Sequence, residues 1–222
     1  MSNQQRIPLF PLGLVLLPQM PLPLHIFEER YKSMIAECID QNKEFGIVYF
    51  NGTDIQAIGC TASIQKILKR YDDGRLDILT MGEKRFQISQ MYDEKPYLEA
   101  KVTFFDDQLE ANQAACQDLA ENGMNLIEQF AEIAGVQVDY GFAEKMNVKS
   151  ISFIIAGCEG FSYPEKQKFI EMSSTYERLK KAVGSLTKIL DRTRLTAEIQ
   201  RIIGGNGHMK QFPGVSPGSS DE

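Results

Sequence analysis

Side chains that could form a catalytic nucleophile and its base are few in this chain and lie far apart. Residues 214–218 match the letters GxSxG, in which a sharp turn between a strand and a helix exposes a serine, here Ser216. Only four residues follow this segment, so we expect no helix to complete the turn. The two histidines, His25 and His208, have no partners arranged for catalysis. We therefore predict no catalytic residue, and we expect His25 to hydrogen-bond at the start of a helix.

Metal, redox and phosphate chemistry also lack the patterns that they require. The cysteines form no CxxC pair, which predicts reduced and mostly buried thiols at Cys38, Cys60, Cys116 and Cys158. The glycine cluster at 204–207 lacks the lysine and the serine or threonine of a phosphate-binding loop. We interpret Gly204 and Gly205 as a helix stop, and we expect neither a metal nor a cofactor.

The charge balance argues against nucleic acid as a partner. The formal net charge is −6, whereas affinity for a phosphate backbone depends on lysine and arginine. Positive residues do gather in one part of the chain, at Lys66, Lys69, Arg70, Arg75, Lys84 and Arg85. Acidic residues of the same segment are expected to offset most of them, namely Asp72, Asp73, Asp77 and Glu83. RNA binding stays an alternative with its own test, a steep dependence on salt.

Aromatic side chains offer a different kind of binding surface. Eight of them lie in or beside expected strands, at Phe45, Tyr49, Phe50, Tyr71, Tyr92, Tyr97, Phe104 and Phe105. We expect most to be core residues, because large apolar side chains are usually buried. Any that face outward could hold apolar side chains of an unfolded segment, and a free sheet edge could add an extended peptide as a strand.

The apolar run at 7–24 predicts neither a signal peptide nor a membrane span. Prolines interrupt it at positions 8, 11, 18, 21 and 23, and only Arg6 precedes it as a positive charge. A span needs roughly 20 apolar residues in an uninterrupted helix. We therefore predict a cytoplasmic protein with no membrane partner.

The first half of the chain predicts short strands around one helix. Strands are expected at 7–10, 15–17, 45–50, 58–67, 76–81, 85–91 and 98–104, with turns at Asn51-Gly52, Asp73-Gly74 and Gly82. The apolar positions change parity between Ile64 and Ile67, which predicts a bulge. Apolar residues recur at three and four between 25 and 42, which predicts an amphipathic helix where Arg30 pairs with Glu28 or Glu29.

From residue 106 onward the pattern is helical. One apolar stripe ends at Gly135, a second covers 148–155, and capping boxes at Ser162 and Ser174 open two more helices. The last stripe runs over 176–190 and could continue through Leu195, Ile199 and Ile202. Residues 205–222 carry few large apolar groups, and we predict a disordered tail there.

Three blocks of sequence resemble the N-terminal domain family of Lon proteases. The first is PLFPL at 8–12, VLLP at 15–18 and LPLHIFEERY at 22–31. The second is DGR at 73–75 with Leu79, Gly82 and RFQI at 85–88, and the third is KQK at 166–168 with YERL at 176–179. The resemblance covers about residues 6–190. Gln19 departs from it, because the family often places glycine after this proline, so we expect a differently shaped turn.

By this resemblance we expect an α+β fold. A PUA-like antiparallel β-barrel, or pseudo-barrel, with one inserted helix would cover residues 1–105, a helical bundle 106–204, and the tail 205–222. The implied function is recognition of unfolded or extended polypeptide segments, or of a protein partner, in protein quality control or proteolysis. We expect no enzyme, because the ATPase loop and the Ser/Lys peptidase pair of Lon are missing. A peptidase with an unrecognised site and an RNA-binding module are the alternatives, and the binding residues are left open.

Overall fold

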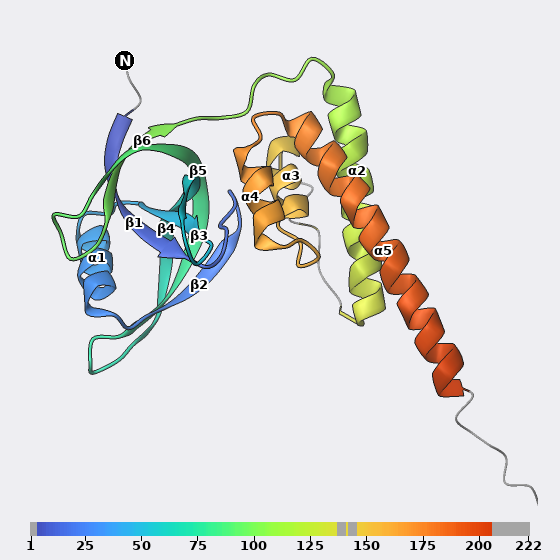
Figure 1. Cartoon of the computed structure of the whole chain (residues 1–222), viewed down its shortest axis with the longest axis horizontal. Helices are drawn as coiled ribbons and strands as arrows, with labels where there is room; N and C mark the ends of the chain where they lie inside the picture. The colour runs from blue at the N-terminus through green and yellow to red at the C-terminus, as the bar shows by residue number, and fades with distance from the viewer. Residues whose placement is uncertain (1–3, 137–140, 142–145, 206–222) are drawn as a thin grey trace, which may run out of the picture.

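The computed structural model describes residues 4–136, 141 and 146–205. These residues form six strands and five helices. The strands and the first helix make up one part of the molecule, and the other four helices make up a second part beside it (Figure 1). The tail predicted at 205–222 lies, apart from Gly205, outside the described residues, together with His208 and Ser216.

The elements follow one another in an α+β order. The strands are β1 (Gln4–Leu12), β2 (Pro21–Ile26), β3 (Phe45–Phe50), β4 (Ile55–Arg70), β5 (Leu76–Tyr92) and β6 (Glu99–Phe104). The helices are α1 (Glu29–Asp40), α2 (Gln113–Ala134), α3 (Val148–Ala156), α4 (Tyr163–Glu171) and α5 (Thr175–Gly205).

The strands pair in a mixed sheet whose order returns on itself. From β5 the pairing passes through β4, β3, β1 and β6, and β6 pairs again with β5. The prediction of an antiparallel sheet is wrong for one pair, because β1 and β3 are parallel, with Leu9 opposite Gly46. Parallel neighbours need a long crossover connection, and here β2 and α1 supply it.

The turn predicted at Gly82 is also wrong, because β5 runs through this residue without a break. A side chain at position 82 would place its Cβ 2.1 Å from the carbonyl oxygen of Leu17. Backbone hydrogen bonds hold the loop there, from Gln19 N to Gly82 O at 2.8 Å and from Gly82 N to Met20 O at 3.0 Å. The residues expected as a strand at 15–17 belong to this loop, and their apolar character reflects the burial of Leu16 and Leu17.

Two further local signals in the strand half are confirmed, and the first helix differs from its prediction. Asp73 and Gly74 form the turn between β4 and β5, with φ of 82° at Gly74. The register of β4 against β5 shifts between Ile64 and Lys66, where a bulge is predicted. The first helix is shorter than expected, because residues 21–26 form β2 and α1 begins at Glu29.

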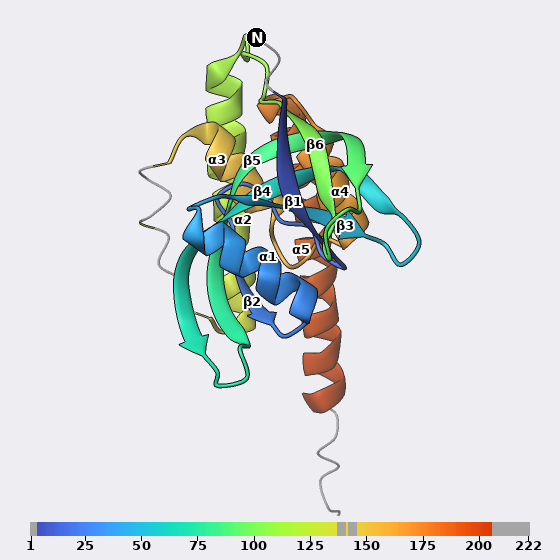
Figure 2. The ribbon, with the colours of Figure 1, turned by 90° about the vertical axis from the view of Figure 1, so that its left-hand side faces the viewer.

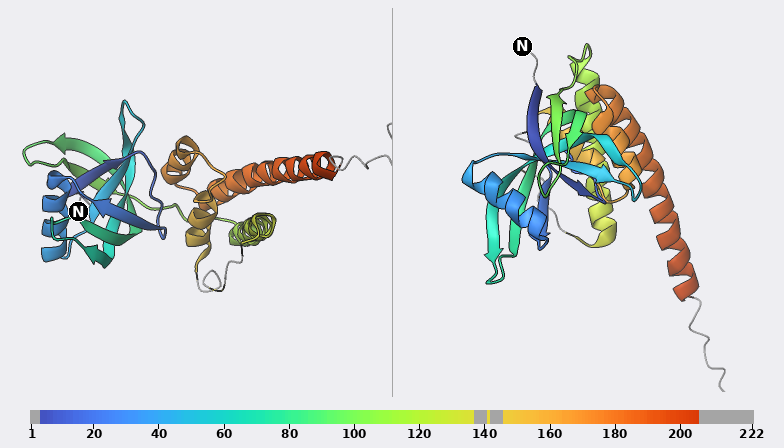
Figure 3. Two further views of the ribbon diagram at one scale, coloured as in Figure 1. Left: turned by 90° about the horizontal axis from the view of Figure 1, so that it is seen from below. Right: turned by 60° about the vertical axis from the view of Figure 1, so that its left-hand side comes forward.

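Helix ends follow the predicted caps. Gly135 adopts a left-handed φ of 68° after α2, and the capping box of Ser162 opens α4. Ser174 Oγ accepts a hydrogen bond from Glu177 N at the start of α5. The described part of α5 reaches Gly205, so the helix stop expected at Gly204 and Gly205 lies at the limit of the described residues and stays a prediction. Helix α5 extends past the end of α2 (Figure 3). Its apolar stripe is buried as far as Leu190, but Leu195 and Ile199 beyond it are 58% and 46% exposed.

One apolar core runs through both parts of the molecule. It includes Ile35 and Phe45 from the strand part and Phe153, Phe169 and Leu186 from the helices. A smaller cluster around Phe86 fills the strands. No described helix has the length and apolar character needed to cross a membrane.

Candidate functional site

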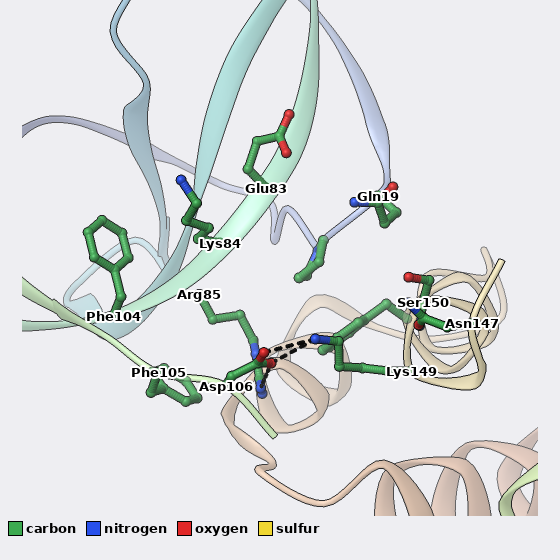
Figure 4. Close-up of a pocket in the computed structure, with 12 residues that line it drawn as sticks. Gln19, Glu83, Lys84, Arg85, Phe104, Phe105, Asp106, Asn147, Lys149 and Ser150 are labelled. Carbon is green, nitrogen blue, oxygen red and sulfur yellow. Dashed lines mark hydrogen bonds and ion pairs between the residues drawn. The ribbon is translucent and has the colours of Figure 1, made fainter. Parts of the chain in front are cut away.

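A pocket of about 480 Å³ lies where the strand part meets the helices. Its apolar lining is formed by Phe104 and Phe105 at the end of β6 and by Phe153 of α3. Its polar lining comes from both sides, with Lys84 and Arg85 on β5, Asp106 after β6, and Asn147, Lys149 and Ser150 at the start of α3 (Figure 4). Side chains from distant segments therefore share one concave surface, which is the common form of a ligand site.

Beneath this pocket, one carboxylate binds two arginines. Asp107 accepts hydrogen bonds from Arg85 of β5 and from Arg178 of α5, and Thr175 donates a third. The side chains of Arg85, Arg178 and Asp107 are 2%, 0% and 5% exposed. Both guanidiniums also lie against the ring of Phe153, at 5.1 Å for Arg85 and 3.8 Å for Arg178. We refer to Arg85, Asp107 and Arg178 as the buried charge cluster.

The remaining donors of this cluster bind backbone and hydroxyl oxygens. Arg85 Nη1 donates to Ile170 O at 3.1 Å and also to Met172 O. Arg178 donates to Met172 O at 3.0 Å and to Ser152 Oγ at 2.9 Å. Across the described residues, every buried side-chain nitrogen and oxygen has a hydrogen-bond partner. Every buried polar atom of the cluster therefore has a partner, and the cluster connects β5 with α4 and α5. It contains no free acid or base.

The charge of the cluster is fixed by its own contacts. Burial by itself would raise the pKa of the Asp107 carboxyl, but the hydrogen bond and charge of Arg178 outweigh it and hold that pKa below its ordinary value. At the pocket surface, Lys149 binds Asp106 at 2.9 Å, and this contact together with the neighbouring backbone lowers the pKa of Asp106 despite partial burial. Both carboxyls are thus ionised near neutral pH.

The polar groups of this pocket are suited to binding. Its lining includes the amide of Asn147 and the hydroxyl of Ser150, and contains neither histidine nor cysteine. Asn147 caps α3 by accepting from Ser150 N at 2.9 Å. Over the part of the chain that the structure describes, no group of three or more potential ligands could hold a metal ion.

Of the residues singled out in the sequence, six line this pocket, and the others lie elsewhere; the six are Gln19, Glu83, Lys84, Arg85, Phe104 and Phe105. His25 lies at the end of β2, and its Nδ1 is 2.5 Å from Asp77 Oδ1 on β5. The expected role of His25 at a helix start is therefore wrong, because this side chain joins two strands. Arg30 does pair with Glu28, at 2.8 Å.

The prediction of free and mostly buried thiols is confirmed. All four thiols are free, and three are buried. Burial raises the pKa of Cys38 and of Cys158 to about 11, so both are protonated near neutral pH.

The prediction for the aromatic side chains is wrong. Of the eight aromatics expected to be mostly core, only Phe45 and Tyr97 are buried. The others are half-buried or exposed because they lie at strand ends and along the pocket.

The sequence interpretation missed Asp107 and Arg178. A signal for Arg178 exists, because it lies four residues before Ala182 on the buried face of α5. An arginine on such a face needs an acidic partner. The partner is 71 residues away in the sequence, and nothing local identifies it.

The fold resembles solved N-terminal domains of Lon. The Lon N-terminal domain protein from Xanthomonas campestris superposes with a TM-score of 0.62 at 19% identity, over 81% of this chain and 98% of that one. The N-terminal domain of Mycobacterium avium complex Lon protease gives a TM-score of 0.66 at 14% identity, over 82% and 98%.

Sequence relatives point the same way. Lon protease of Dictyoglomus thermophilum is 25% identical over 87% of this chain and 26% of its own length. Lon protease of Parabacteroides distasonis is 25% identical over 87% of this chain and 25% of its own. The chain thus spans about a quarter of the length of these relatives. Residues 6–188 match the family described as the ATP-dependent protease La (LON) substrate-binding domain, and the chain belongs to that family.

Proposed function

We propose that this chain is a non-catalytic module that binds unfolded or extended segments of other proteins. The observation that carries the proposal is the match of residues 6–188 to a family described as a substrate-binding domain. In the same proposal, the recognised segments are clients of protein quality control or proteolysis. The free thiols suit a reducing compartment, and a cytoplasmic location stays our prediction.

The pocket between β5, β6 and α3 is the contact surface that we propose. Its phenylalanines can hold an apolar side chain, and Lys84, Lys149 and Asn147 can bind the carbonyl groups beside it. The buried charge cluster supports this surface from beneath, because it holds β5 and α5 in one arrangement. A fixed surface loses less conformational entropy on binding than a flexible one.

We also propose the division of the chain. Residues 1–105 form a PUA-like pseudo-barrel and residues 106–204 a helical subdomain. Support comes from the strand order that returns to β5, and from the elements after β6, which are all helices in the part of the chain that the structure describes.

Binding to a chain that lacks stable structure tests the function. Labelled casein, followed by fluorescence anisotropy, is expected to bind the full chain, whereas a compact native protein is not. Phe105→Ala and Lys149→Ala are expected to weaken binding by about three- to tenfold, while Lys188→Ala on the exposed face of α5 leaves it unchanged. Absence of casein binding by the unmodified chain contradicts the function. Binding that is indifferent to both pocket variants contradicts only the location.

A further inference from the structure

One edge of β4 has no partner over half of the strand. The pairing of β3 with β4 ends where Phe45 lies opposite Ala62. Beyond that point β4 continues to Arg70 and pairs with β5 on its other side. Within the described ranges, no other strand pairs with residues 63–70. An unpaired edge presents backbone N–H and C=O groups to which an extended peptide can bond.

A groove of about 370 Å³ runs along this edge. Its walls are residues 63–67 of β4, the C-terminal end of α1 with Ile39, and residues 42–44 of the loop that follows α1, including Lys43 and Glu44. Ile39, Ile64 and Ile67 are half-buried against the core and give the groove an apolar floor. Figure 2 shows α1 beside the projecting hairpin of β4 and β5. The groove residues belong to α1, to the loop after it and to β4. Helix α1 lies on the side of the strands away from the helical part (Figure 1).

Cations without an ion-paired carboxylate gather along this edge. Glu44, the acid in the lining of the groove, pairs with Lys84 at 3.2 Å. Among the described residues, none of the four cations of this edge lies within 4.0 Å of a carboxylate in an ion pair; they are Lys43, Lys66, Lys69 and Arg70. Lys43 and Lys66 line the groove itself. In a chain with a net charge of −6, such a group of free cations is a local exception.

Three acids that were expected to offset these cations bind other groups. Asp73 pairs with Arg75 at 2.7 Å. Asp77 binds His25 and accepts from the hydroxyl of Tyr71. Glu83 accepts a hydrogen bond from the Ser63 hydroxyl at 2.6 Å. These three acids therefore bind groups other than the cations of the edge. Lys69 lies over the ring of Tyr71 at 4.4 Å, so Lys43 and Lys66 in the groove lining are the cations that an acidic segment would meet.

We propose that residues 63–67 of β4 bind a short, extended, acidic segment of a client polypeptide as an added strand. The inference rests on the proposed function and adds a second contact surface with its own sequence preference. The backbone of the segment pairs with β4, its apolar side chains meet Ile39, Ile64 and Ile67, and its carboxylates meet Lys43 and Lys66. The segment is short because β4 is bulged on both sides of Lys66, which bends the edge.

Polypeptide fits this surface better than nucleic acid does. A phosphate backbone would use the cations, but it has no counterpart for an unpaired strand edge or for an apolar floor of isoleucines.

A capped peptide of alternating valine and glutamate is the direct probe, read by fluorescence anisotropy with the full chain. The double variant Lys66→Glu with Lys69→Glu is expected to weaken binding by about tenfold. The matched control carries the same charge change on α5, as Lys181→Glu with Lys188→Glu, and is expected to bind within about twofold of the unmodified chain. The same peptide with lysine in place of glutamate is expected not to bind.

Strand addition has its own readout. A peptide with N-methyl groups on alternate residues cannot donate the ladder hydrogen bonds, and we expect it to lose most of its affinity. The unmethylated peptide is expected to slow amide hydrogen exchange in residues 63–67 and not in α5.

Equal binding of the methylated peptide, or loss of binding in the α5 control, overturns the proposal. So does tighter, Lys66-dependent binding of a single-stranded RNA. If casein binds and this peptide does not, the β4 edge is excluded while the proposed function stands; if neither binds, both fail.

Discussion

The guanidinium of Arg178 and the carboxylate of Asp107 form an ion pair across 71 residues of sequence, with side chains that are 0% and 5% exposed. The same carboxylate binds Arg85 of β5. Through this single acid, a strand of the first part is tied to the long helix of the second. The arrangement of the two parts, and with it the shape of the pocket between them, depends on Asp107.

Replacing Asp107 with asparagine is expected to destabilise the protein by about 3–5 kcal/mol, because it leaves the buried Arg178 without a counter-charge and the buried Arg85 with only Asp106, at 3.8 Å. Urea unfolding followed by circular dichroism measures the change. The neighbouring Asp106→Asn is the control, since its side chain is 68% exposed and pairs with Lys149 at 2.9 Å and with Arg85 only at 3.8 Å. An exposed pair of that kind contributes about 0–1 kcal/mol. Equal losses in the two variants would show that the cluster has no special role.

The same carboxyl predicts how stability varies with pH. The pKa of Asp107 is lower in the folded chain than the ordinary value of about 3.9. Its stabilisation is therefore fully present well above that value and decreases as the pH falls through the folded pKa. The difference in unfolding free energy between the unmodified chain and Asp107→Asn is expected to be constant near neutral pH and to shrink below about pH 4. A difference that does not change on acidification contradicts this account.

Gly82 lies where β5 passes the loop that leads to β2. Its replacement by alanine is expected to cost about 1–3 kcal/mol, because the new Cβ would overlap the Leu17 carbonyl oxygen and force the loop away. Gly184→Ala is a matched control on α5, where an added Cβ meets no atom within 4 Å. In a helix, alanine is favoured over glycine by about 1 kcal/mol, so this control is expected to gain stability. Thermal unfolding of the two variants should shift in opposite directions.

Elements whose cause is local could be predicted from the sequence. The turn at Asp73-Gly74, the caps at Gly135 and Ser162, and the strand at 45–50 each depend on a few neighbouring residues. The family resemblance added the α+β fold in which these elements are expected to assemble. Gly82 shows the limit of local reasoning, because a glycine required by a close approach has the same appearance in sequence as a glycine required by a turn.

Features that depend on distant contacts could not be predicted in this way. The parallel pairing of β1 with β3 depends on where α1 carries the chain. The pocket joins the middle of β5 and the end of β6 to the start of α3, which is 43 residues later in the case of Asp106 and Lys149. The free cations at the β4 edge became visible only when the partners of Asp73, Asp77 and Glu83 were known. Each of these features depends on which segments fold next to one another.

Gln19 tests a position where the resemblance and the sequence disagree. It follows Pro18 in the loop beside Gly82 and has a φ of 64°, in the left-handed region that glycine adopts readily. The turn therefore has a backbone shape that glycine favours. An L-residue in this region is strained by about 1–2 kcal/mol, whereas glycine loses about 0.4–1 kcal/mol more backbone entropy on folding. Gln19→Gly is expected to raise the unfolding free energy by about 0.5–1 kcal/mol, since the bond from its N–H to Gly82 O is kept.

Gly74→Ala, at a φ of 82°, is the opposite change and is expected to lower the unfolding free energy. Chemical denaturation measures both, and a loss of stability in Gln19→Gly would mean that the glutamine side chain has a role that its backbone strain conceals.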